Sequence, residues 1–152
     1  MTRSTPSGVH QIFGALDVND RLLIRGLGAL IQANMLACHF GFFEHACVSL
    51  WICMESSMHL ILRHLKAIGN PNPTSHDAGT YLDAVFESKY PSSGYFVDFY
   101  SDRIRTLHPN SRYGVYPFVP LQADDFYELN ESLVATYDFI VTGNVREELK
   151  GH

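Results

Sequence analysis

The fold is decided by residues 42–68, which read FFEHACVSLWICMESSMHLILRHLKAI. The stretch contains no proline or glycine, and Gly69-Asn70-Pro71 follows it as a normal helix stop signal. As one continuous helix it would be about 40 Å long, which is the length of a helix in a bundle. We therefore predict a helix over Phe42–Ile68 and an all-α fold.

Apolar residues also recur at helical intervals before and after this stretch. No strand pattern of useful length competes with them. Thr74 and Asp77 have the spacing of a capping box at the start of the third helix. The segment 108–122 contains three prolines and a glycine, so we expect an ordered, irregular connection there. The helices that we expect span 19–37, 42–68, 75–88, 95–107 and 123–142.

The composition describes one domain. The chain has 152 residues, of which 46% are hydrophobic and 18% are charged, so it can bury a core without disulfides or a structural metal. We see no internal repeat or domain boundary. We therefore expect a single domain over 1–152, with a core over 19–143 and a frayed tail over 144–152.

Two features favour the cytoplasm. The N-terminal residues lack the apolar core of a signal peptide, and the longest apolar stretch, Leu22–Cys38, is interrupted by a basic residue and two amides. Cys38, Cys47 and Cys53 lie on or directly after predicted helices, which suggests buried free thiols in a reducing compartment. We therefore expect a cytoplasmic protein that does not cross a membrane.

The charge balance disfavours one class of function. Eleven Lys and Arg residues stand against sixteen Asp and Glu, a formal net charge of −5. A protein that coats nucleic acid without specificity is expected to be basic. A local basic patch remains, because 101–112 holds three arginines and one histidine against a single aspartate.

Within that patch, Arg103 and His108 are separated by four residues, and Pro109 follows them. A guanidinium can bind two phosphate oxygens and an imidazole can transfer a proton near neutral pH, a combination that suits phosphodiester cleavage without a metal. The alternative is structural: Arg103 pairs with a carboxylate and His108 caps the helix C-terminus.

The geometry of a helix limits what one chain can do with this pair. On a continuous helix the side chains of Arg103 and His108 would lie about 140° apart, so one chain alone would not bring both to a single phosphate. A two-fold dimer, or a helix that ends before His108, would solve this.

Three landmarks, in this order, resemble the HEPN family (higher eukaryotes and prokaryotes nucleotide-binding) over roughly Phe42–Gly143. The first is the long helix with Glu55 in its middle, which continues into apolar and then basic residues. The second is the stretch 72–77, Asn-Pro-Thr-Ser-His-Asp, which is similar to the family's Pro-x-x-His-Asp/Ser opening of the third helix. The third is Arg103 to His108, which resembles the family's Arg-x(4–6)-His signature.

The resemblance implies both a fold and a function. The fold would be an up-and-down bundle of four to five helices that forms homodimers, with Arg103 and His108 of both protomers in a shared cleft. Catalytic members are metal-independent endoribonucleases, in toxin pairs with a nucleotidyltransferase-type antitoxin or in phage defence. The substrate would then be RNA, and neither a metal nor another cofactor is implied.

An alternative function stays open, because other members of the family have lost catalysis and serve as binding or regulatory modules. Here Ile104 stands where the family often has Asn, Asp or His after the arginine, although Arg105 could supply a donor instead. The alternative is therefore a non-catalytic helical module that binds a nucleotide or a partner protein.

Two further residues could support the site. Glu55 shares a helical face with apolar residues, so its carboxylate needs a partner there. That partner could be Arg103, or Glu55 could form a purely structural salt bridge or hydrogen bond. His76 stands at the start of the third helix, where we expect it to cap or pack, with a role in the site as the alternative.

Two other constellations are not expected to carry chemistry. The Cys and His residues between 38 and 47 match no compact zinc-ligand spacing, so we expect no metal. Gly26 and Gly28 have no preceding strand and no third glycine, so they do not form a phosphate-binding loop. We expect these glycines to permit close helix packing.

Overall fold

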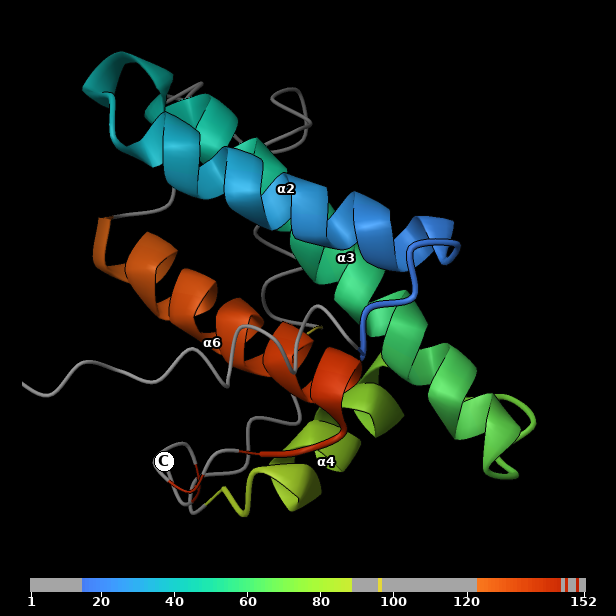
Figure 1. Ribbon diagram of the computed structural model, residues 1–152. Helices are drawn as coiled ribbons and strands as arrows, with labels where there is room; N and C mark the ends of the chain where they lie inside the picture. Colours follow the sequence, from blue (N-terminus) through green and yellow to red (C-terminus); the bar gives the residue numbers. More distant parts are fainter. Residues whose placement is uncertain (1–14, 89–95, 97–122, 146, 148–149, 151–152) are drawn as a thin grey trace, which may run out of the picture.

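The computed structural model describes residues 15–88, 96, 123–145, 147 and 150, and within them the regular elements are helices, without a strand (Figure 1). The predicted all-α fold is confirmed for this part of the chain. The fourth predicted helix, 95–107, and the connection 108–122 lie outside the described residues except for Phe96, which is helical and fully buried. The elements are α2 (Arg21–Ala37), the short 3-10 helix η1 (Phe40–Phe42), α3 (Phe43–Ala67), α4 (Ser75–Val85) and α6 (Ala123–Thr142).

Helix α3 is the element that the others pack against. α2 and α3 form a helical hairpin joined through η1, while α6 and α4 contact α3 from other sides (Figure 1). Its core-facing side chains include Leu50, Trp51 and Met54, each at most 1% exposed. The remaining members of the same core come from α2, α4, α6 and Phe96.

The three helices α2, α3 and α6 pack closely at Gly26. A Cβ atom on Gly26 would lie 1.7 Å from the hydroxyl oxygen of Tyr137 on α6 and 3.0 Å from Cβ of Ser56 on α3. Tyr137 is buried there and donates a hydrogen bond to the backbone carbonyl of Cys53 at 3.0 Å. The expectation of close helix packing is therefore confirmed for Gly26. It is wrong for Gly28, which is exposed and where an added Cβ atom would meet nothing within 4 Å.

The ends of α4 follow local backbone and side-chain chemistry. The predicted capping box at its start is confirmed: the Asp77 amide donates to Thr74 Oγ1 at 3.3 Å, and the Thr74 amide donates to Asp77 Oδ2 at 2.7 Å. α4 ends at Val85 rather than at the predicted Ser88, because Glu87 adopts a left-handed conformation with φ of 52°.

The thiols divide between core and surface. Cys47 and Cys53 are buried, as predicted. The prediction is wrong for Cys38, which is exposed at the C-cap of α2 and donates from Sγ to the Asn34 carbonyl at 3.3 Å. The cause is position: Cys47 and Cys53 fall on the inner face of α3, whereas Cys38 follows the last turn of α2.

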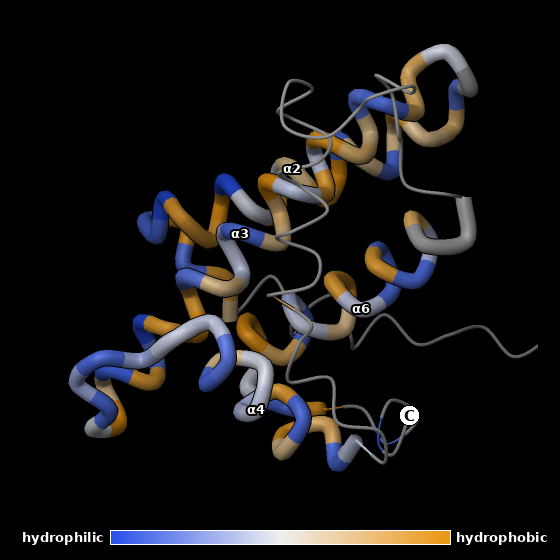
Figure 2. Tube along the Cα trace, turned by 180° about the vertical axis from the view of Figure 1, so that it is seen from behind, coloured by the Kyte–Doolittle hydropathy of each residue, from blue (hydrophilic) through white to orange (hydrophobic). Residues whose placement is uncertain are grey.

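Figure 2 shows apolar and polar positions along every described helix, as expected for helices that are buried on one side. One of them, α3, is long and apolar enough by length and composition to cross a membrane. However, 61% of its most apolar window is buried inside the domain. The core helix of a globular protein has the same composition.

Candidate functional site

The three residues with the strongest sequence claim to chemistry, Arg103, Arg105 and His108, lie outside the described residues. The structure therefore locates the two supporting residues, Glu55 and His76. They stand on different helices, Glu55 in the middle of α3 and His76 in the first turn of α4.

Glu55 is half-buried on α3. One turn before it lies the fully buried Trp51, and Met58, three residues after it, is packed against the core. The carboxylate thus lies at the edge of the apolar core. A carboxylate in such a place is stabilised by a hydrogen bond or an opposite charge.

His76 is exposed in the first turn of α4, and the capping box of this helix is formed by Thr74 and Asp77. The hydrogen bonds from the amide and hydroxyl of Thr74 lower the pKa of Asp77 below its ordinary value, and the charge of His76 adds a smaller effect in the same direction. The predicted capping role therefore belongs to Thr74 and Asp77. The imidazole of His76 remains accessible to solvent.

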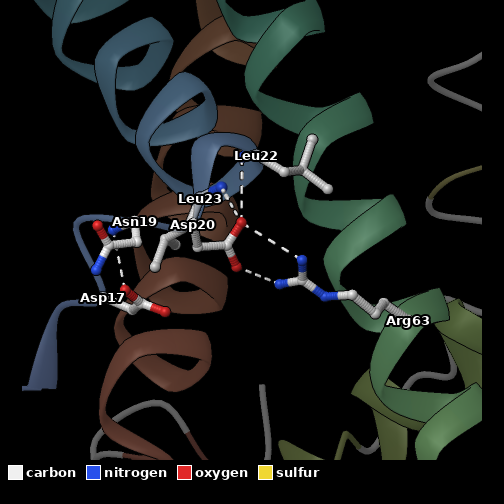
Figure 3. Close-up of polar contacts among 6 residues, drawn as sticks. All are labelled: Asp17, Asn19, Asp20, Leu22, Leu23 and Arg63. Atoms are coloured by element: carbon white, nitrogen blue, oxygen red, sulfur yellow. Dashed lines mark hydrogen bonds and ion pairs between the residues drawn. The ribbon is translucent and has the colours of Figure 1, made fainter.

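An ion pair joins the start of α2 to α3 (Figure 3). Asp20 is the N-cap residue, and its Oδ1 accepts hydrogen bonds from the amides of Leu22 at 3.1 Å and Leu23 at 3.3 Å. Arg63 of α3 donates to Oδ1 at 3.4 Å and makes a second, shorter contact with Oδ2. The Asp20 carboxylate thus caps the N-terminus of α2 and also joins this helix to α3.

Asp20 and Arg63 each stabilise the charged form of the other, as expected for a structural ion pair. Arg63 is the largest influence that lowers the pKa of Asp20, and the two amides lower it further. In turn, the hydrogen bond with Asp20 raises the pKa of Arg63. An open depression surrounds the pair, lined also by Asp17, Asn19, Arg21 and Leu22. Because Asp20 already accepts from the Arg63 guanidinium and from the amides of Leu22 and Leu23, these groups serve the ion pair and the helix cap.

A second pair joins α3 to α4. The hydroxyl of Tyr81 lies 3.1 Å from Nε2 of His64, and the two ring centroids are 5.3 Å apart. Tyr81 also contacts Phe139 of α6, with ring centroids 6.2 Å apart. The contact therefore fixes α4 at the place where α3 and α6 come together. His64 is exposed, so its ring is open to solvent on its other side.

Metal ligands do not converge in the part of the chain that the structure describes. No group of three or more His, Cys, Asp or Glu side chains there could hold a metal ion. Cys47 is buried in the core, whereas Cys38 and His39 are exposed at the other side of η1.

Comparison of the chain with protein-family models, with curated proteins and with solved structures finds no match.

Sequence reasoning did not find the Asp20–Arg63 and His64–Tyr81 pairs. Their members are 43 and 17 residues apart in the chain. Asp20 stands just before the first residue of α2, and His64 stands in the last turn of α3. Neither position indicates its partner, because that depends on how the helices are rotated against each other.

Proposed function

We propose that this chain is a HEPN-like, metal-independent endoribonuclease domain that acts at a cleft between two protomers, in a toxin–antitoxin or phage-defence setting in the cytoplasm. The observation that carries the proposal is the Arg103-x-x-x-x-His108 spacing, followed by Pro109, in a chain whose described elements are helices. The proposed architecture is an up-and-down bundle of four to five helices, in which 95–107 supplies the helix that bears the motif.

The proposed reaction is cleavage of RNA by its own 2′-hydroxyl. His108 accepts the 2′-hydroxyl proton, the 2′ oxygen attacks phosphorus, and the bond from phosphorus to the 5′ oxygen breaks. Arg103 stabilises the negative charge that develops on the phosphorane. The His108 of the second protomer can protonate the leaving 5′ oxygen, so a two-fold cleft supplies both the base and the acid. The products are a 2′,3′-cyclic phosphate and a 5′-hydroxyl.

Three other residues have proposed supporting roles. Arg105 supplies a hydrogen-bond donor that Ile104 does not. The carboxylate of Glu55, half-buried on α3, binds and orients the guanidinium of Arg103. This contact would join the motif to the central helix. His76 is accessible at the start of α4 and could contact RNA at the border of the cleft.

The test is cleavage of a fluorescent single-stranded RNA in excess chelator. We expect wild-type protein to produce fragments with 2′,3′-cyclic phosphate ends. His108→Ala and Arg103→Ala should each lower the rate by at least about a hundredfold, the usual size of general acid–base and electrostatic contributions. The matched control is His59→Ala, an exposed histidine of α3 without a proposed role, which should cleave at the wild-type rate. Intact RNA under all conditions with wild-type protein would refute the proposal.

The role of Glu55 is tested separately by Glu55→Gln. If Glu55 orients Arg103, the variant loses cleavage activity while its thermal stability changes little. A purely structural role predicts the reverse: lower stability with an unchanged rate per folded molecule.

A second candidate function has its own support. The net charge of −5 and the apolar Ile104 beside the motif arginine favour a non-catalytic module that binds a nucleotide or a partner protein. Calorimetric titration with mononucleotides distinguishes this function, since it predicts binding that Arg103→Ala abolishes and no cleavage of RNA. Co-expression with a neighbouring nucleotidyltransferase-type gene, if one is present, tests the proposed antitoxin partner.

A further inference from the structure

The outer face of α2 carries an apolar stripe that the described elements leave uncovered. Ile24, Ile31 and Met35 are 40%, 62% and 67% exposed. The exposed Gly28 lies between them. In chain order, Ile24, Gly28, Ile31 and Met35 stand at i, i+4, i+7 and i+11, within an arc of about 60° on one side of the helix. The opposite side of α2 packs on α3 through its buried residues. Figure 1 shows α2 at the outside of the molecule, on the far side of α3 from α4.

The spacing of the stripe is the same when it is read in either direction. Its four positions, 24, 28, 31 and 35, are separated by four, three and four residues. An antiparallel second copy would therefore place Ile24 opposite Met35 of that copy and Ile31 opposite its Gly28. Gly28 has open space where a side chain would be, so the Ile31 side chain of the other copy has room to pack there. The spacing thus allows the stripe to pair with a second copy of itself.

The charges on α2 favour the antiparallel arrangement. Arg21 and Arg25 are exposed near the N-terminus of the helix, whereas its last turn has no basic residue. In an antiparallel pair these arginines would lie towards the C-terminal carbonyls of the other α2, the negative end of its dipole. A parallel pair would instead bring Arg21 and Arg25 beside the same arginines of the second copy.

We propose that the face formed by Ile24, Gly28, Ile31 and Met35 is an interface with a second copy of this chain, in which the two α2 helices pack antiparallel about a two-fold axis between Gly28 and Ile31. A single helix pair buries less area than the roughly 1,200–2,000 Å² of a stable interface. The dimer should therefore dissociate in the micromolar range. This interface is distinct from the proposed cleft at 103–108, so the substitutions in the stripe, which leave the cleft residues unchanged, distinguish it from association through the cleft.

The first experiment is sedimentation velocity over a dilution series from hundreds of micromolar to low micromolar protein. We expect wild-type protein to pass from dimer to monomer. Ile31→Glu and Met35→Glu, both at exposed positions that the fold does not need, should each weaken association at least about tenfold by burying a charge. The matched control is Ile68→Glu: Ile68 is 61% exposed but lies at the end of α3 outside the stripe, so association should be unchanged. A wild-type chain that is monomeric throughout, or an Ile31→Glu variant that associates like wild type, would overturn the interface.

The second experiment tests the direction of packing by disulfide formation in a Cys38→Ser background. In the antiparallel pair, position 24 faces position 35 of the second copy, while the two copies of position 35 are about 16 Å apart along the axis. A mixture of the Ile24→Cys and Met35→Cys variants should therefore form the mixed disulfide under mild oxidation, and Met35→Cys alone should not form a homodimer. Efficient crosslinking of Met35→Cys alone, without the mixed product, would contradict the antiparallel arrangement.

Discussion

At the scale of single residues, two glycines two positions apart have opposite surroundings. Gly26 leaves room for the Tyr137 hydroxyl, which lies beside it and donates to the carbonyl of Cys53. Gly28 faces solvent. The sequence Gly-Leu-Gly cannot distinguish them, because a rotation of about 200° along the helix separates the two positions and only the packing of α2 decides which one is inside.

Alanine substitutions test this difference. Gly26→Ala should destabilise the protein by about 1–3 kcal/mol, since the new methyl group would overlap the Tyr137 side chain and force it out of place. Gly28→Ala should be neutral or stabilising by up to about 1 kcal/mol, because alanine is the better helix former and has open space there. Urea denaturation of both variants and wild type gives the comparison. Equal effects of the two substitutions would be inconsistent with the packing described above.

The cysteines give a second residue-scale prediction. Burial raises the pKa of the Cys53 thiol to about 12, and Cys47 is fully buried, whereas Cys38 is exposed. At pH 8 an aromatic disulfide reagent should therefore modify one thiol of the native protein rapidly and all three only in denaturant. The Cys38→Ser variant should show no rapid phase. Rapid modification of that variant would mean that the core opens more readily than its burial indicates.

At the scale of elements, the starts of α2 and α4 depend on one or two polar side chains. Asp20 begins α2 and Thr74 with Asp77 begins α4, so these helix boundaries follow from local chemistry that the sequence displays. The end of α4 is less visible in the sequence. Glu87 takes a left-handed conformation that a glycine would signal but a glutamate does not.

Two substitutions separate the capping role of Asp20 from its ion pair. Asp20→Ala removes both and should cost about 0.5–2 kcal/mol from the cap, plus up to about 1 kcal/mol from the partly exposed pair. Asp20→Asn keeps an acceptor for the amides of Leu22 and Leu23. It should therefore lose only the contribution of the ion pair with Arg63. Thermal denaturation of both variants at neutral pH tests the order.

The same carboxylate predicts a pH dependence. Arg63 and the helix amides hold the pKa of Asp20 below its ordinary value in the folded state. Its charge therefore stabilises the fold above the unfolded pKa of about 3.9, and this contribution is lost as pH falls through the lower, folded pKa. The stability difference between wild type and Asp20→Asn should shrink below about pH 4 and be constant between about pH 5 and 8. A difference that persists unchanged in strong acid would mean that the charge of Asp20 does not contribute.

At the scale of the whole molecule, α3 holds the described helices together, because α2, α4 and α6 all pack on it. Its centre contains the only tryptophan of the chain, Trp51, which is 1% exposed. Loss of the α2–α3–α6 packing would expose this indole. Trp51 therefore reports on the core as a unit.

We expect Trp51 fluorescence to be blue-shifted in the native protein and to shift to the red in one cooperative transition. Because one core cluster includes residues from all four described α-helices, the fluorescence and far-ultraviolet circular dichroism transitions should coincide in urea. A fluorescence change that precedes the loss of helix would show instead that the helices separate before they unfold.

The sequence by itself determined the four described α-helices and the capping box at the start of α4. The periodicity predicted α6 with its observed bounds and placed α2 and α3 within two residues, because helix formation and termination depend on neighbouring residues in the chain. It also singled out Arg103 and His108 as the candidate site, which stays a prediction. Only the tertiary structure decided which glycine is buried, which cysteine is exposed, that Asp20 meets Arg63, and that His64 meets Tyr81. These features depend on the rotation of one packed helix against another, which is set by many weak contacts at once and is not encoded at any single position.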